Sequence, residues 1–194
     1  MAEEEEFAKL SLPDQFQHKN WKARKGGYET AAKEFKTAQP TDPVVREFIL
    51  ESGLWKGAVS DSNVAAQQEA LNAYNAFLDA TGAEGARKTR GSTVQGIVEK
   101  GLMGRPAAKA AALESLLLLI ELDKADPIIE ELLTFLAHKQ PKVIAAALAA
   151  LTAIYHNYGC KTVDPKPALK ALPKAFGHAD KNVRAEATLS LIHI

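Results

Sequence analysis

A helix–turn–helix pattern that recurs about every 40 residues is the feature that most constrains the fold of this chain. Within each copy the apolar residues follow helical spacing, as Leu113, Leu116 and Ile120 do on one helix face. A short polar turn separates the two helices, and an apolar or small residue follows it. The residues aligned after the turns are Trp21, Val64, Ala107, Val143 and Val183. This period is typical of HEAT repeats, whose helix pairs bury their apolar faces against neighbouring pairs.

The sequence therefore predicts an all-α fold, a HEAT-repeat array of paired antiparallel helices that forms an α-solenoid. Five pairs are visible, at about 13–37, 43–81, 86–123, 125–159 and 165–194. The sequence stops at the apolar residues Leu191–Ile194, in the middle of the pattern, so a sixth pair is expected to be truncated. Residues 1–9 contain the run Glu3–Glu6 and are predicted to form a disordered acidic tail, which leaves 10–194 as the folded domain.

Composition argues against several classes of partner. Lys plus Arg number 24 and Asp plus Glu number 24, so no net charge attracts nucleic acid or a membrane surface. The acidic N-terminus is unlike a targeting signal, and the apolar stretch Leu116–Ile120 is far shorter than the roughly 18–20 residues of a membrane span. The single cysteine, Cys160, excludes an intramolecular disulfide and a cysteine-only metal site. The chain is therefore expected to work in the cytoplasm, with neither nucleic acid nor a membrane as its partner.

Enzyme motifs are missing from the sequence. It contains no glycine-rich phosphate loop, no Gly-x-Ser-x-Gly and no His-Glu-x-x-His. His18, His138 and His178 occupy equivalent places in their repeats, which lie too far apart in a solenoid to share a metal ion. They are expected at helix C-termini, where a histidine complements the helix dipole. The prediction is a protein that is not an enzyme, without catalytic residues, metal, cofactor or small-molecule substrate.

The turns carry an excess of positive charge. Their basic residues are Lys19, Lys22, Arg24, Lys25, Arg105, Lys109, Lys139, Lys142, Lys181 and Arg184, against only Asp61 and Asp180. In a solenoid these turns fall along one edge, and edges are surfaces with which repeat arrays bind partners. A basic edge favours an acidic protein partner and an association that weakens with salt. The alternative is a set of solvated, lysine-rich turns without a partner.

The two tryptophans have different expected roles. Trp21 lies in a turn among charged residues, where it is either an interface hot spot or a staple packed under the loop. Trp55 shares an apolar helix stripe with Phe48 and Ile49, so it is expected in the core.

Segments spread along the chain carry a resemblance to a known family. They are Leu12-Pro13, His18–Arg24, Gly27–Glu29, Leu54–Lys56, Asp61–Gln67 and Leu169–Lys174. Together they resemble a TOG domain, the tubulin-binding HEAT array of microtubule polymerases and anchoring proteins, and in particular the first TOG domain of a fungal-like polymerase. The resemblance runs from about Leu12 onward, departs from the family pattern at Ser190–Ile194, and implies six HEAT repeats in a flat paddle.

The resemblance also implies a function for the turns. They are expected to bind one αβ-tubulin heterodimer in its curved form, the early turns on β-tubulin and the later ones on α-tubulin. The implied tubulin-binding residues are Lys19, Asn20, Trp21, Ser62, Asn63, Val64, Arg105, Lys109, Lys139, Lys142, Lys181, Asn182 and Arg184. The chain would then be a module of a microtubule polymerase that promotes plus-end growth and spindle assembly. Its expected places are the cytoplasm and the cytoskeleton, at microtubule plus ends, spindle poles and kinetochores.

Two other hypotheses stay open. A generic HEAT scaffold would bind its partner on the concave helix face and gives no reason for a tryptophan in a turn. A small-molecule hydrolase would need a pocket in which titratable groups converge. The solvent exposure of Trp21 separates the tubulin interpretation from the generic scaffold, because a buried Trp21 removes the main anchor of the tubulin interpretation.

Overall fold

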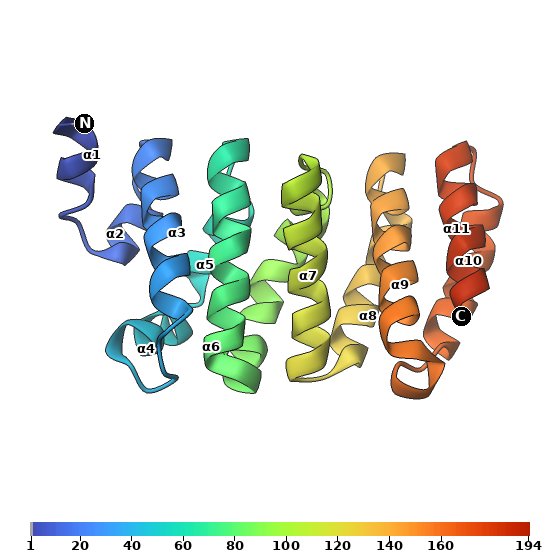
Figure 1. The fold of residues 1–194 in the computed structure, drawn as a ribbon. Helices are drawn as coiled ribbons and strands as arrows, with labels where there is room; N and C mark the ends of the chain where they lie inside the picture. The colour runs from blue at the N-terminus through green and yellow to red at the C-terminus, as the bar shows by residue number, and fades with distance from the viewer. Residues whose placement is uncertain (1) are drawn as a thin grey trace. The chain divides into compact units, whose positions relative to one another are not determined.

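The computed structural model describes residues 2–194, which form helices joined by turns and include no strand (Figure 1). The all-α class predicted from the sequence is confirmed. The chain divides into two compact units, one ending at Asp123 and the other spanning Lys124–Ile194.

The first unit contains the short helices α1 (Ala2–Phe7) and α2 (Leu12–Phe16) and then α3 (Trp21–Phe35). They are followed by α4 (Pro43–Leu50), α5 (Gly53–Val59), the long α6 (Val64–Gly96), the π-helical turn η1 (Ile97–Gly101) and α7 (Pro106–Leu122). Gly82 has a φ of 58° and divides α6 into two helices, a conformation that costs glycine less than any other residue. The part of α6 before Gly82 therefore completes one helix pair, and the part after it opens the next.

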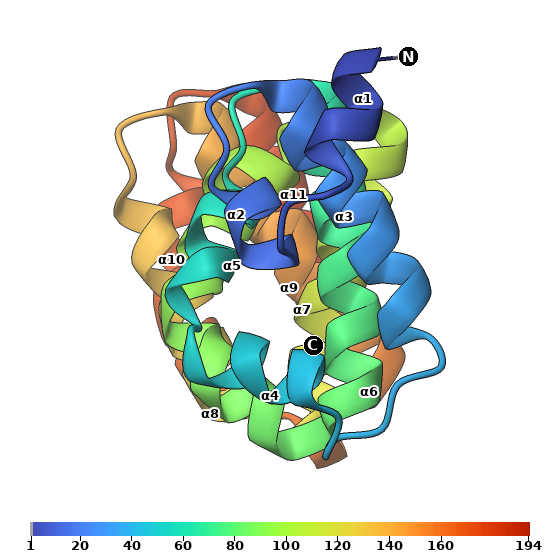
Figure 2. The ribbon, with the colours of Figure 1, turned by 90° about the vertical axis from the view of Figure 1, so that its left-hand side faces the viewer.

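The helices of the first unit form two layers. Figure 1 shows α3, the first part of α6 and α7 side by side, whereas α2 and α5 lie in a second layer that Figure 2 shows beside them. Since α3, the first part of α6 and α7 run in the same direction, the turns that precede them lie at one end of this unit.

An aromatic cluster fills the core of the first unit around Trp55, which is fully buried as the sequence predicted. Its ring lies 4.8 Å from Phe77, 5.1 Å from Tyr74 and 5.5 Å from Phe16, measured between ring centroids. Tyr74 also links the two parts of α6, because its hydroxyl is hydrogen-bonded to Thr89 at 2.7 Å. Burial raises the pKa of Tyr74 to about 12.

The second unit contains α8 (Ala125–Thr134), the 3₁₀ turn η2 (Phe135–Ala137), α9 (Pro141–Thr162), α10 (Lys166–Phe176) and α11 (Lys181–His193). Helices α9 and α11 pack side by side, and the Ser190 hydroxyl donates to the Leu148 carbonyl at 3.1 Å. Gly159, with a φ of 70°, breaks α9. By length and composition α9 could cross a membrane, but half of its most apolar window is buried inside this unit, as in a core helix.

The N-terminal segment differs from its prediction. The sequence predicts a disordered tail over 1–9, whereas the structure has α1 over Ala2–Phe7. Glutamate has good helix propensity, and the half-buried Phe7 gives this segment a contact, with its ring 5.0 Å from the ring of His18. The Gln15 side-chain amide also donates to the Leu10 carbonyl at 2.9 Å, which ties the following turn to α2.

Candidate interaction surface on the interhelical turns

The helices that follow the turns define which residues are equivalent. These helices begin at Trp21, Val64, Pro106, Pro141 and Lys181. The predicted alignment of Val143 and Val183 with Trp21 is therefore wrong, since both valines lie two residues further into their helices and are buried. Proline suits the first helical position, so Pro106 and Pro141 start their helices without the aromatic or branched residue that stands at the starts of α3 and α6.

Trp21 and Val64 expose much of their surface at neighbouring helix starts. Trp21 is 39% exposed and Val64 is 40% exposed, and the helices that they begin, α3 and α6, pack against each other. Apolar side chains this accessible are not core residues, so Trp21 is not a buried staple. The first unit therefore presents two apolar side chains side by side on its turns.

A side-chain acceptor closes most of the turns in the same way. The third residue before the helix accepts a hydrogen bond from the backbone N–H two residues later, at 3.0 Å for His18, 2.9 Å for Asp61, 3.1 Å for His138 and 3.0 Å for His178. A histidine Nδ1 that accepts is unprotonated, so these rings act as turn acceptors. The three histidines lie at or just after the C-terminal ends of α2, η2 and α10, where the sequence predicted them, and the bond to Nδ1 adds a role in closing the turn.

Two predicted contact residues, Asn20 and Asn63, also cap helices, as does their turn equivalent Asp180. The side-chain oxygens of Asn20, Asn63 and Asp180 accept hydrogen bonds from the first N–H groups of α3, α6 and α11. Asn20 accepts from Lys22 at 3.0 Å, and Asn63 accepts from Ala65 at 3.0 Å. These two asparagines therefore shape the turns that hold Trp21 and Val64, whatever else they contact.

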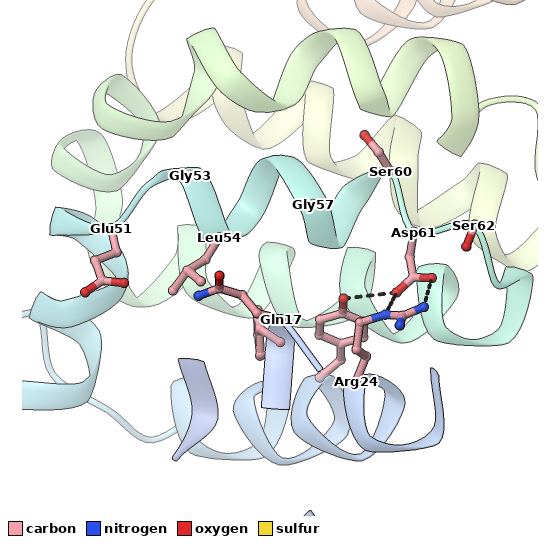
Figure 3. Close-up of a pocket in the computed structure, with 11 residues that line it drawn as sticks. Gln17, Arg24, Glu51, Gly53, Leu54, Gly57, Ser60, Asp61 and Ser62 are labelled. Atoms are coloured by element: carbon pink, nitrogen blue, oxygen red, sulfur yellow. Dashed lines mark hydrogen bonds and ion pairs between the residues drawn. The ribbon is translucent and has the colours of Figure 1, made fainter. Parts of the chain in front are cut away.

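An ion pair joins the first two turns (Figure 3). Arg24 Nε donates to Asp61 Oδ2 at 2.6 Å and its Nη2 donates to Oδ1 at 2.8 Å, while the Tyr28 hydroxyl donates to Oδ2 at 3.1 Å. The Asp61 side chain is 2% exposed and that of Arg24 is 17% exposed. From the sequence, both residues were expected to be charges of the turn surface, but in the structure they form an ion pair with each other.

The pKa values of this cluster follow from its geometry. Desolvation raises the pKa of Asp61, but the hydrogen bonds from Arg24 and the Asn63 amide, together with the charge of Arg24, outweigh it and hold that pKa below its ordinary value. The hydrogen bond to Asp61 raises the pKa of Arg24, and desolvation raises that of Tyr28. The cluster is therefore an ionised carboxylate held by a cation and a neutral phenol.

The other predicted residues are exposed on the turns of their own unit. In the first unit these are Lys19, Ser62, Arg105 and Lys109, and in the second unit Lys139, Lys142, Lys181, Asn182 and Arg184. Arg184 Nη1 donates to the carbonyls of His178 at 2.7 Å and Ala179 at 2.8 Å, which holds its side chain against its own turn.

The groove at the ion pair is lined by four titratable side chains, of which Arg24, Tyr28 and Asp61 are bonded to one another and Glu51 is the fourth. The groove lies between α2 and α5 and is lined by Gln17, Leu54 and Ser60 among others, with Glu51 toward its other end (Figure 3). The carboxylate of Asp61 is already committed to Arg24 and Tyr28. Among residues 5–194, whose side chains the structure describes, no three His, Cys, Asp or Glu side chains come together as metal ligands would.

Known proteins resemble this chain in sequence or fold over most of its length. The model of the XMAP215/Dis1/CLASP TOG domain family matches residues 6–194. The spindle pole body component alp14 of Schizosaccharomyces pombe is 37% identical over 99% of this chain and 24% of its own length. Protein mini spindles of Drosophila melanogaster is 34% identical over 100% of this chain and 9% of its own. The chain thus spans a quarter or less of the length of these relatives.

Solved structures lead to the same family. One, described as the structural basis of tubulin recruitment and assembly by microtubule polymerases with TOG domain arrays, is 28% identical, with a TM-score of 0.83 over 93% of this chain and 39% of that one. The TOG3 domain of Drosophila melanogaster Mini spindles has the same fold, with 19% identity and a TM-score of 0.76 over 91% of this chain and 76% of that one. From the paired helices, the turns and these matches, the chain belongs to the XMAP215/Dis1/CLASP family of TOG domains.

Proposed function

We propose that this chain binds the αβ-tubulin heterodimer through its interhelical turns, as a module of a microtubule polymerase. Family membership and the similarity to a structure described for tubulin recruitment support the choice of partner. The observation that carries the choice of surface is Trp21, which is 39% exposed at the start of α3. Exposed tryptophans that a partner can cover are the residues most often found as interface hot spots.

The turns offer the two kinds of contact that a protein interface needs. Trp21 and Val64 provide apolar area in the first unit, while Lys142, Lys181 and Arg184 provide positive charge in the second. Apolar anchors supply most of the affinity, and surrounding charges steer an acidic partner and set the on-rate. Binding should therefore combine a few sensitive residues with a marked salt dependence.

The proposed contact set is the one that the resemblance implies. It consists of Lys19, Asn20, Trp21, Ser62, Asn63, Val64, Arg105, Lys109, Lys139, Lys142, Lys181, Asn182 and Arg184. Asn20 and Asn63 contribute chiefly by fixing their turns, because their side-chain oxygens cap α3 and α6.

The finer statements belong to the same proposal. We propose that the curved heterodimer is the preferred form, and that the parent protein promotes plus-end growth and spindle assembly at plus ends, spindle poles and kinetochores. The names of the relatives, a spindle pole body component and mini spindles, support a cytoskeletal and spindle location. We propose a binding module without enzymatic activity, whose partner is neither nucleic acid nor a membrane.

A comparison of two variants separates this proposal from a scaffold that binds on its helix faces. Asn72 is exposed on α6, far along the helix from the turn at Val64. Titration with fluorescently labelled tubulin should show weakened binding for Trp21→Ala and unchanged binding for Asn72→Arg. Weakened binding for Asn72→Arg alone would favour the scaffold hypothesis and contradict the proposed surface.

A further inference from the structure

We infer that Arg24 and Asp61 are positioning residues, which hold the turn before Trp21 and the turn before Val64 in one fixed arrangement for the partner. The inference rests on the proposed function, since it assigns a role at the same surface. Neither residue needs to touch the partner in this role.

The hydrogen bonds run from one turn to the other without a gap. Arg24 Nη1 donates to the His18 carbonyl at 2.8 Å and the Lys19 carbonyl at 3.1 Å, in the turn just before Trp21. Its Nε and Nη2 donate to Asp61, and Asp61 Oδ1 accepts from the Asn63 amide at 2.9 Å, in the turn just before Val64. A guanidinium is planar and rigid, so bonds on two of its edges restrict the relative position of both turns.

The second unit shows what the same turn looks like without such a link. Arg184 occupies the position of Arg24 and bonds its own turn carbonyls in the same manner. The place of Asp61 is taken there by His138 and His178, and the neighbouring helix α9 has the buried Ile144 at the position of Arg24. Because Ile144 carries no charge, the pair that Arg24 forms with Asp61 has no counterpart at these positions of α9 and the turn before α11.

The apolar anchors lie on the linked turns. Trp21 and Val64 follow directly after the residues that the ion pair connects. A surface that is already in its binding arrangement loses less conformational entropy when a partner binds, and so binds more tightly with the same contacts. The near-complete burial of Asp61 limits screening by salt, so the link should persist at ionic strengths that weaken exposed charges.

A charge argument and a positioning argument predict opposite effects for the same variant. Asp61→Asn removes a negative charge beside the turns, so a surface that acts by charge alone should bind an acidic partner more tightly. The asparagine oxygen can still accept from the Asn63 amide, so the second turn keeps its local closure while the ion pair is lost. If the ion pair positions the turns, Asp61→Asn should weaken binding by roughly 10-fold, about 1.4 kcal/mol.

The experiment compares three variants of the whole chain in two assays. Asp61→Asn and Arg24→Lys break the two-bond pairing, the second without changing the net charge. Glu84→Gln is the matched control, because Glu84 pairs with Arg46 at 2.8 Å between α6 and α4 in the same unit and its side chain is 44% exposed. Tubulin affinity is measured by titration at low salt, and hydrogen exchange of the segments 18–24 and 60–66 is measured without tubulin.

The expected result is weaker tubulin binding and faster exchange in both segments for Asp61→Asn and Arg24→Lys, with neither change for Glu84→Gln. If the wild-type chain binds tubulin, unchanged or tighter tubulin binding by Asp61→Asn would overturn the inference and leave the proposed function standing. A wild-type chain that binds no tubulin would overturn the proposed function. In that case, faster hydrogen exchange of segments 18–24 and 60–66 in Asp61→Asn and Arg24→Lys alone would still support the link between the turns.

Discussion

Replacing Trp21 by alanine tests how much of the proposed affinity comes from one side chain. Trp21 is 39% exposed, which leaves roughly 60–100 Å² of a tryptophan side chain for a partner to cover. At about 25 cal/mol per Å², covering this area contributes about 1.5–2.5 kcal/mol. Trp21→Ala should therefore weaken tubulin binding roughly 10- to 70-fold.

The assay is a titration of labelled tubulin at constant low salt, with the melting temperature of each variant recorded in parallel. Leu50→Ala is the control, because Leu50 is 74% exposed at the end of α4, away from the turns. Trp21 begins its helix, a position that alanine also tolerates, so the fold should survive. An unchanged affinity for Trp21→Ala would refute the reasoning and return Trp21 to a local packing role.

Three further predictions concern salt, pH and microtubule growth. Tubulin binding should weaken as salt rises, and Arg184→Glu should weaken it more than Arg184→Ala. Both variants lose the bonds from Arg184 to the turn carbonyls, so equal effects on tubulin affinity would show that Arg184 makes no charge contact. The pKa of Asp61 lies below its ordinary value in the folded chain, so its stabilising effect should be complete above the ordinary aspartate pKa of about 3.9 and should disappear as pH falls through the lowered value. The difference in unfolding free energy between wild type and Asp61→Asn, measured with urea, should then be constant near neutral pH and shrink in acid, and a difference that grows in acid would contradict this sign. The chain alone should slow microtubule growth at high dose by sequestering dimers, since delivery needs a second tethered site; faster growth at substoichiometric dose would show that tethering is not required.

The helical periodicity was sufficient to predict the fold class. Stripes such as Leu113, Leu116 and Ile120 depend only on residue spacing, and the packing of each helix pair on the next follows from burying those stripes. Trp55 was predictable for the same reason, because its apolar neighbours lie on one helix face.

The register of the turns could not be read from apolar residues alone. Val143 and Val183 look like the equivalents of Val64, but each helix start is set by the proline or the capping residue before it. The histidine positions contained the correct register, since His18, His138 and His178 all lie three residues before a helix start. Using this signal requires knowing that the histidine ring accepts a hydrogen bond from the backbone of its turn.

The ion pair between Arg24 and Asp61 was also outside the reach of the sequence. The two residues are far apart in the chain, and each looked like an exposed turn charge. Only the packing of α3 against α6 brings them together and buries the carboxylate. The prediction of a basic turn surface survives for the exposed lysines, Arg105 and Arg184. It does not survive for Arg24, which pairs with Asp61, or for the half-buried Lys25, which pairs with Glu29.

Size-exclusion chromatography of the chain with purified αβ-tubulin at low salt tests the central claim most directly. The account predicts that the wild-type chain elutes with tubulin as a complex, and that Trp21→Ala reduces the complex under the same conditions. Separate elution of the wild-type chain and tubulin at low salt would contradict it.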